Sequence, residues 1–221
     1  MSATLEMRGD VGVIKLDDGK RNAVNHTLLD SLNAALDEAE GKAKCVVLMG
    51  REGTFSAGFD LKFFQTATRE EMTGLVMRGS ALTVRLLKYP MPVIAACTGH
   101  GIAMGAFTLL SCDFRYGMTG DFRLGANETQ INMVLPVFGF ELSKERINPL
   151  EKSRAISEGY LYTPEEAVTA GFLDAAIDPA QFEATVMAKA EALAKLNGKV
   201  FSKNRMGLRQ KTIEAIEASH G

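Results

Sequence analysis

The chain contains 221 residues, of which 46% are hydrophobic and 24% charged, a composition typical of a folded globular protein and not of a disordered one. Its 25 basic and 27 acidic residues give a formal net charge of −2, so no general attraction to nucleic acid is expected. No run approaches the ~20 apolar residues of a membrane-spanning helix and no signal peptide is apparent, which predicts a cytoplasmic protein without a membrane partner. The three cysteines, Cys45, Cys97 and Cys112, lie in apolar runs and predict buried reduced thiols.

Predicted strands and helices alternate through the first 124 residues, an order that favours an α/β fold with right-handed crossovers. Residues 5–8 and 11–16 flank the turn residues Gly9-Asp10 and predict a hairpin, and the continuous apolar run 45–49 predicts a strand buried on both faces. The other elements predicted in this part are helices over 27–40, 70–88 and 103–111, strands over 92–97, 112–116 and 122–124, a loop over 50–62 and a tight turn over 98–101.

The rest of the chain is predicted to be mainly helical. Thr163-Pro164-Glu165-Glu166 is typical of a helix start, with Thr163 as N-cap and Glu166 three residues later, and Gly171 is placed to end that helix. The region from about Ser143 onward is interpreted as an appended helical layer or arm, not as a clear second domain.

Two glycine-rich segments, 55–62 and 98–106, follow the two most apolar predicted strands. In open α/β sheets, ligands bind beyond the carboxyl ends of the strands, and the second segment leads directly into a helix. Two converging backbone N–H groups there would form an oxyanion hole for a developing enolate or tetrahedral oxyanion. The alternative is that the glycines only relieve steric crowding in tight turns. Neither segment matches a P-loop or a dinucleotide-binding motif.

These segments carry a resemblance to a known family. Residues Phe55-Ser56-Ala57-Gly58-Phe59-Asp60-Leu61, followed by Gly99 to Cys112-Asp113, resemble the crotonase (enoyl-CoA hydratase/isomerase) superfamily. The similarity extends from about Leu5 to Ile177. Further matching segments are Asn22-Ala23-Val24, Gly125-Ala126-Asn127-Glu128-Thr129-Gln130 and Pro164 to Asp174, of which Asn127 to Gln130 is most like mitochondrial-type Δ3,Δ2-enoyl-CoA isomerases.

The resemblance implies a fold and a substrate class. The expected fold is an α/β spiral of ββα turns over residues 1–142 that carries an acyl-CoA site. Residues 143–221 would form a C-terminal helical region of the same unit, for oligomerisation or to cover the active site. A homotrimer or a dimer of trimers is implied. No cofactor is implied, because coenzyme A is part of the substrate.

The resemblance also assigns the oxyanion hole, to the backbone N–H groups of Ala57 and Met104. The family usually has glycine where this chain has Met104. The N–H is present with any side chain, but the thioether would narrow or reshape the acyl pocket. Further residues assigned to substrate binding are Arg21, Ala23, Ser56, Gly58, Phe59, Asp60, Leu61, Lys62, Gly105 and Phe107.

One carboxylate is expected to perform the chemistry. Hydratases of the family use two glutamates, and the corresponding positions here are Phe107 and Glu128. A single base suffices for isomerisation, because it removes a C2 proton and returns it at C4. The sequence therefore favours an enoyl-CoA isomerase with Glu128 as catalytic residue, provided that burial among Phe107, Met104 and Leu135 raises the pKa of Glu128. The simpler interpretation of Glu128 is an acid favoured by a helix dipole.

Other acids and cations near these motifs are weaker candidates. Dienoyl-CoA isomerases have an aspartate after the loop proline, where this chain has Val137, and nearby Glu141 is more typical of a solvated charge. His100 precedes a predicted helix, where a structural role is favoured over that of a base. Candidates for binding the CoA phosphates and adenine are Lys20, Arg21, Ala23, Lys62 and, from a neighbouring subunit, Lys203; candidates for the acyl site are Phe63, Phe64, Met72 and Met77.

Three alternative functions stay open at this point. Weak hydration or thioester hydrolysis would use the same oxyanion hole, with Glu128 activating water. A catalytically silent acyl-CoA-binding protein is the alternative from a different class, because Phe107 and Met104 both depart from the family pattern. No metal site is predicted, since His26 and His220 have no acidic or cysteine companions at ligand spacing.

Overall fold

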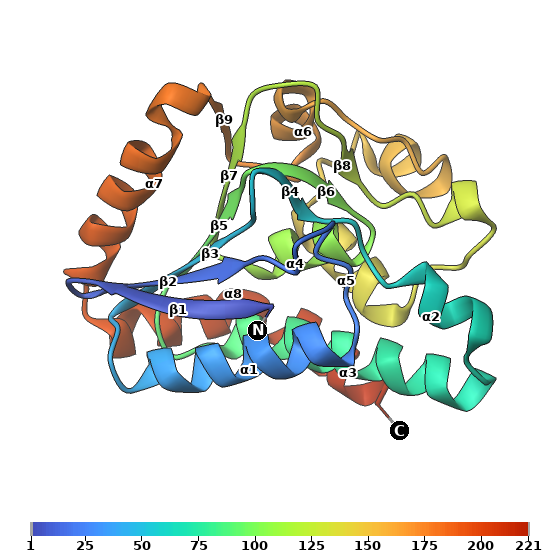
Figure 1. The fold of residues 1–221 in the computed structure, drawn as a ribbon, viewed down its shortest axis with the longest axis horizontal. Helices are drawn as coiled ribbons and strands as arrows, with labels where there is room; N and C mark the ends of the chain where they lie inside the picture. Colours follow the sequence, from blue (N-terminus) through green and yellow to red (C-terminus); the bar gives the residue numbers. More distant parts are fainter. Residues whose placement is uncertain (1, 221) are drawn as a thin grey trace.

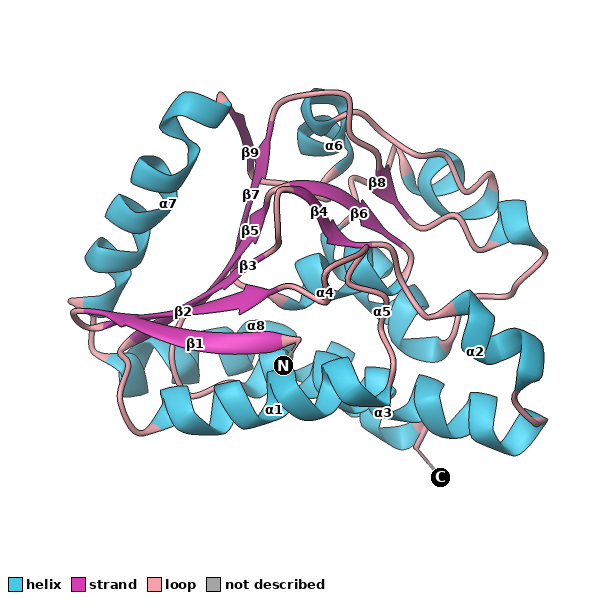
Figure 2. Cartoon of the chain, in the orientation of Figure 1, coloured by secondary structure: helices cyan, strands magenta, loops and turns pink. Residues whose placement is uncertain are grey.

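Parallel strands form two sheets that are packed at an angle to each other (Figure 1; Figure 2). The computed structural model describes residues 2–220. The larger sheet contains, in spatial order, β1 (Ala3–Arg8), β2 (Val11–Leu16), β3 (Cys45–Met49), β5 (Val93–Cys97), β7 (Phe114–Met118) and β9 (Ala175–Ile177). The smaller sheet contains β4 (Gly53–Ser56), β6 (Gly99–Ile102) and β8 (Leu124–Gly125). All neighbouring strands are parallel except β1 and β2, which form the predicted antiparallel hairpin.

Helices cover both faces of the larger sheet. The helices are α1 (His26–Glu40), α2 (Leu61–Thr66), α3 (Arg69–Lys88), α4 (Met104–Ser111), α5 (Val137–Arg146), α6 (Pro164–Ala170), α7 (Pro179–Ala194) and α8 (Gly198–Ala218), with a 3₁₀ turn η1 (Thr129–Ile131) and a π-helical turn η2 (Ser153–Ser157). Helix α7 covers one face, where its Phe182 and Val186 share a buried cluster with Val47 of β3 and Ile94 of β5. The opposite face packs on a larger core to which α1, α3, α4, α5 and α8 all contribute (Figure 1).

Most predicted elements are confirmed, with ends shifted by one or two residues. Helix α1 begins after Asn25, whose side chain accepts a hydrogen bond from the Leu28 N–H. Helix α6 has the expected capping box between Thr163 and Glu166, and Gly171 ends it at φ +97°. The alternation of strands and crossover helices gives the predicted α/β class.

Two predictions about the glycine-rich segments were wrong. Residues 98–101 are not a tight turn, because Gly99–Ile102 forms strand β6 of the smaller sheet. Gly99 permits this pairing, since a Cβ at that position would lie only 2.0 Å from the carbonyl carbon of Gly53 on β4. The segment 50–62, predicted as a loop, contains β4 and the start of α2.

The region after residue 143 is not exclusively helical. Its strand β9 pairs with β7 and completes the larger sheet. Its last helix, α8, packs on α3 and α5 and contributes Ile213 and Ile216 to the main core. The three cysteines are buried and free, as predicted. Within residues 2–220 no helix combines the length and the hydrophobicity that crossing a bilayer would require.

Candidate active site

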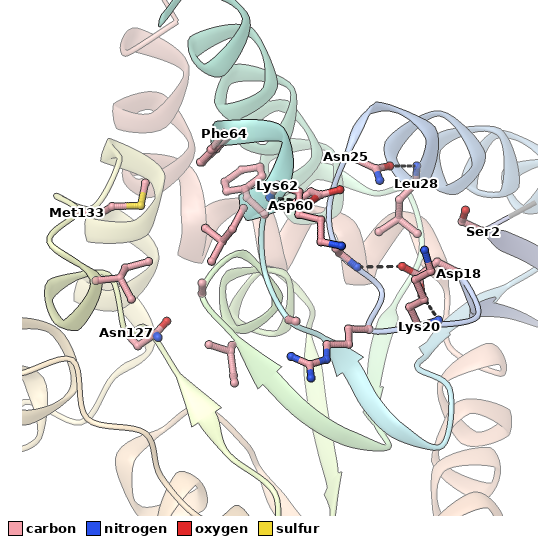
Figure 3. Close-up of a pocket in the computed structure, with 18 of the residues that line it drawn as sticks. Ser2, Asp18, Lys20, Asn25, Leu28, Asp60, Lys62, Phe64, Asn127 and Met133 are labelled. Carbon is pink, nitrogen blue, oxygen red and sulfur yellow. Dashed lines mark hydrogen bonds between the residues drawn. The ribbon is translucent and has the colours of Figure 1, made fainter. Parts of the chain in front are cut away.

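A cavity of about 870 Å³ opens between the loop after β2, the start of α2, the β6–α4 junction and the loop that follows β8. Figure 3 shows Asp18, Lys20 and Leu28 on one side of the cavity and Asn127 and Met133 on the opposite side. The segments that follow the carboxyl ends of β4, β6 and β8 therefore all line this cavity, as expected for ligand sites of parallel sheets.

The loop after β2 is held by Asn22, a buried residue in the left-handed region at φ +50°. Its side-chain amide donates to the carbonyls of Leu16, at 2.8 Å, and Phe55, at 3.1 Å. Asp18 accepts hydrogen bonds from the backbone N–H groups of Lys20, Asn22 and Ala23. These hydrogen bonds hold the loop beside β4. Residues of the loop thereby line the cavity although they do not form a β-strand.

The segment after β4 and the first turn of α4 are in direct contact. Gly58 lies at φ +86°, and a Cβ there would be 2.8 Å from Ala103 Cβ and 3.4 Å from Met104 N. A Cβ at Gly105 would be 2.5 Å from the carbonyl oxygen of Ser56. Only glycine at both positions allows the backbone of the two segments to approach this closely.

The two predicted oxyanion donors differ in their present hydrogen bonds. Met104 is the first residue of α4, where a backbone N–H has no acceptor within the helix. The Ala57 N–H donates to the Arg21 carbonyl at 3.0 Å. A thioester oxygen bound here would therefore either share the Ala57 N–H with the Arg21 carbonyl or replace that carbonyl as its acceptor.

Glu128 is buried at the cavity wall, and its environment differs from that of an exposed glutamate. The side chain follows β8 just before η1, and its Oε2 atom has no hydrogen-bond partner. Burial raises the pKa of Glu128 to about 7. A carboxyl group with this pKa can both accept and release a proton near neutral pH.

The other two carboxylates among the described residues that line the cavity have structural partners. Asp18 holds the loop after β2, as described above. Asp60 caps α2, where its carboxylate accepts a hydrogen bond from the Lys62 N–H at 3.0 Å. Glu141, the alternative near α5, does not line this cavity and pairs with Lys144 at 2.5 Å. Of these lining carboxylates, Glu128 is therefore the one that is not engaged in holding a loop or capping a helix.

The structure brings together part of the predicted substrate-binding set. The predicted residues that line the cavity are Arg21, Ala23, Ala57, Phe59, Asp60, Leu61, Lys62 and Glu128. Those that lie behind its surface are Ser56, Gly58, Met104, Gly105 and Phe107. For Ser56 the reason is a structural bond, because its hydroxyl donates to the Asn22 carbonyl at 2.8 Å and accepts from the Gly58 N–H.

Phe107, predicted to contact substrate, is instead a core residue. It is fully buried, and its ring meets that of Phe138 edge-on at 5.6 Å. A Cβ at Gly139 of α5 would lie 3.0 Å from the Phe107 ring, so α5 packs tightly on this side chain. No second carboxylate stands at this position to assist Glu128.

Some lining residues were missed by sequence reasoning. They are Ser2, Asp18, Asn25, Thr27, Leu28, Ile102, Ala103, Asn127, Ile131 and Met133. Asn127 and Ala103 adjoin predicted residues and could have been found by extending the motifs. Of the acyl-site candidates, Phe64 lines the cavity, whereas Phe63, Met72 and Met77 do not.

Cations gather at the entrance, whereas the histidines have structural partners. Lys20, Arg21 and Lys62 line the cavity and are exposed, and Lys203 lies elsewhere on α8. His100 accepts a hydrogen bond from the Arg123 N–H at 3.0 Å, in agreement with the structural role favoured for it. The described residues contain no cluster of three potential metal ligands.

Comparisons with known proteins agree with this geometry. A family model described as enoyl-CoA hydratase/isomerase matches residues 6–217. Enoyl-CoA delta isomerase 3 of Arabidopsis thaliana is 30% identical over 216 residues, which cover 93% of this chain and 91% of the relative. A probable enoyl-CoA hydratase of Bacillus subtilis is 28% identical over 187 residues, which cover 83% of this chain and 71% of the relative.

A solved structure gives the same result. The crystal structure of an enoyl-CoA hydratase/isomerase family protein from Pseudomonas syringae superposes with a TM-score of 0.96 at 35% identity, and the match covers 99% of this chain and 95% of that one. The chain belongs to the enoyl-CoA hydratase/isomerase family, the crotonase superfamily that its loops resemble.

Proposed function

We propose that this protein is a Δ3,Δ2-enoyl-CoA isomerase that uses Glu128 as its single acid–base group. The observation that carries the proposal is the buried Glu128 carboxyl group at the cavity wall, with an unpartnered oxygen and a pKa raised to about 7. Phe107 supports isomerisation over hydration, because a buried phenyl ring replaces the second carboxylate that activation of water would use.

The proposed reaction requires one proton to move between two carbons. Ionised Glu128 removes a proton from C2 of a 3-enoyl-CoA, and the electron pair of that C–H bond forms the C1=C2 double bond of a dienolate, in which C3=C4 is still present. The π electrons of the thioester carbonyl move onto its oxygen, where the Met104 N–H and the Ala57 N–H would stabilise the negative charge. Protonated Glu128 then delivers the proton to C4, where the C3=C4 π electrons form the new C–H bond. The C1=C2 electrons shift to C2=C3, the carbonyl re-forms, and the 2-enoyl-CoA is released.

Exposed cations at the cavity entrance suit the CoA end of the substrate. Lys20, on the loop after β2, and Lys62, on α2, carry positive charge at this cavity (Figure 3), and Arg21 lines it as well. Phosphate groups favour such lysine and arginine side chains. The apolar side chains of Phe59, Phe64, Ile131 and Met133 line the same cavity and suit an acyl chain.

Side-by-side assays of 3-enoyl-CoA and 2-enoyl-CoA substrates test this proposal. We expect rapid conversion of the 3-enoyl thioester to the conjugated 2-enoyl thioester, and at least 100-fold slower loss of conjugation when 2-enoyl-CoA is the substrate. Faster hydration than isomerisation would contradict the proposal, as would release of free CoA from either substrate. Tight binding of both thioesters without turnover would indicate a catalytically silent acyl-CoA-binding protein.

A further inference from the structure

Gly79, in the middle of α3, lies against two side chains of the candidate active site. A Cβ at this position would lie 2.6 Å from Cζ of Phe59 and 3.4 Å from Cε of Met104. Gly79 is buried, and its missing side chain provides the space that the phenyl ring and the thioether methyl group occupy. Phe59 and Met104 therefore meet at one point on α3, although Phe59 precedes α2 and Met104 begins α4.

Phe59 and Met104 differ in how close they lie to the surface of the cavity. Phe59 lines the cavity, and its ring centroid lies 5.7 Å from that of Phe64, which also lines it. Met104 is fully buried and does not line the cavity. Its Cε atom reaches Gly79 of α3, at the position where the Phe59 ring also packs.

We infer that Phe59 and Met104, packed on Gly79, form a floor that limits how deeply an acyl chain can enter the protein. An acyl chain whose thioester lies at the start of α4 would meet this floor and turn along Phe64 toward Ile131 and Met133. Those two side chains remain 39% and 37% exposed, so the far end of a long chain would stay partly in water. The inference rests on the proposed function only in requiring an acyl-CoA ligand.

The floor predicts a characteristic dependence of affinity on chain length. Complete burial of one methylene group improves affinity about fourfold. For the wild-type protein we therefore expect less than twofold improvement per methylene from hexanoyl-CoA to dodecanoyl-CoA. Calorimetric dissociation constants for butanoyl-, hexanoyl-, octanoyl- and dodecanoyl-CoA, with free CoA as reference, measure this directly and need no turnover.

Two variants change the floor in opposite directions. Met104→Ala removes three heavy atoms behind Phe59, and we expect the preference for octanoyl-CoA over butanoyl-CoA to increase at least fivefold. Gly79→Ala places a methyl group against the Phe59 ring and drives the ring toward the cavity. It should weaken octanoyl-CoA binding at least fivefold while free CoA binds as in the wild type.

Two controls separate this effect from a loss of stability. Met104→Leu keeps the volume of the side chain and should preserve the wild-type ratio between octanoyl- and butanoyl-CoA. Met91→Ala truncates another buried methionine that does not line the cavity and should also leave this ratio unchanged.

The results that would overturn the floor differ from those that would overturn the proposed function. Ratios within twofold of the wild type in both Met104→Ala and Gly79→Ala would overturn the floor, even if the enzyme isomerises 3-enoyl-CoA. Chain-length effects as expected, without isomerisation, would support the floor and contradict only the proposed function. Failure of the wild type to bind any acyl-CoA would overturn both.

Discussion

The proposed chemistry depends on a single residue, Glu128, and on the exclusion of water from its carboxyl group. In water a glutamate has a pKa near 4.3 and is a weak base at neutral pH. Here burial disfavours the charged form and raises the pKa to about 7, while Oε2 keeps no internal partner that would stabilise the anion. The same group can thus remove a proton as the anion and return it as the acid.

This shift predicts the pH dependence of the reaction. The ionised form of Glu128 is the active base, so kcat/KM for isomerisation should rise with pH, be half-maximal near pH 7 and reach a plateau above about pH 8. Initial rates at substrate concentrations well below KM, measured from pH 5 to 9, give the profile. A profile that is already flat at pH 5 would show that the essential group has an ordinary carboxyl pKa.

For single residues, the sequence predicted which side chain lies at the cavity better than it predicted the contacts that each residue makes. The position of Glu128 follows from the motif that it shares with the family, and the structure places it at the cavity as expected. The bond from the Ala57 N–H to the Arg21 carbonyl could not be predicted, because it depends on how two segments more than 30 residues apart meet. The same is true of Phe107, whose burial is determined by Phe138 and Gly139 on α5.

Among the elements, the start of α4 combines the proposed oxyanion donor, Met104, with a strained residue. Ala103, the N-cap of this helix, has φ +52° and ψ −122°. That conformation is favourable only for glycine, because a Cβ crowds the neighbouring backbone. The Ala103 N–H donates to the Gly125 carbonyl at 2.9 Å, so pairing between β6 and β8 holds the residue in place.

Replacement of Ala103 by glycine should therefore stabilise the protein. We expect Ala103→Gly to raise the free energy of unfolding by about 1 kcal/mol, measured by urea denaturation. The matched control is Ala106→Gly, two residues into the same buried helix, which should lower it by about 1 kcal/mol through helix propensity and lost packing. Destabilisation by both substitutions would show that Ala103 carries no strain.

The elements predicted from the sequence are those whose side chains show a regular spacing. Helix α1 and strand β3 have clear apolar patterns, and both agree with the structure to within a residue. Strand β6 was missed because its sequence, Gly99-His100-Gly101-Ile102, contains two glycines and only one strong β-former, Ile102. Its pairing depends on close backbone approach between β4 and β6, which is a property of the tertiary fold.

In the molecule as a whole, a buried cluster of charged side chains links α8 to the larger sheet. Asp113 accepts from Arg205 at 3.0 Å and lies 3.4 Å from Arg209, and the side chains of all three are less than 10% exposed. The same carboxylate accepts a hydrogen bond from the Val93 N–H at the start of β5. The C-terminal helix is thus joined to the strand that leads into the glycine-rich segment of the site.

Loss of the shared carboxylate should destabilise the entire fold. Asp113→Ala leaves the buried Arg205 without its counter-charge and leaves Arg209 only Glu145, at 3.5 Å, and we expect a loss of roughly 3–5 kcal/mol in the free energy of unfolding. Glu217→Ala is the control, because it breaks a half-exposed ion pair with Lys88 that also links α8 to α3. It should cost less than about 1 kcal/mol, and equal losses for both variants would contradict a special role for the buried cluster.

The fold places Glu128 in the wall of the same cavity as Ala103, the residue that precedes α4. The most direct test is therefore the isomerisation rate of Glu128→Gln, which keeps the shape of the side chain and removes the base. We predict that kcat falls at least 10³-fold, while the dissociation constant for a saturated acyl-CoA stays within threefold of that of the wild type. Turnover of the variant within tenfold of the wild-type rate would contradict the assignment of Glu128 as the catalytic base.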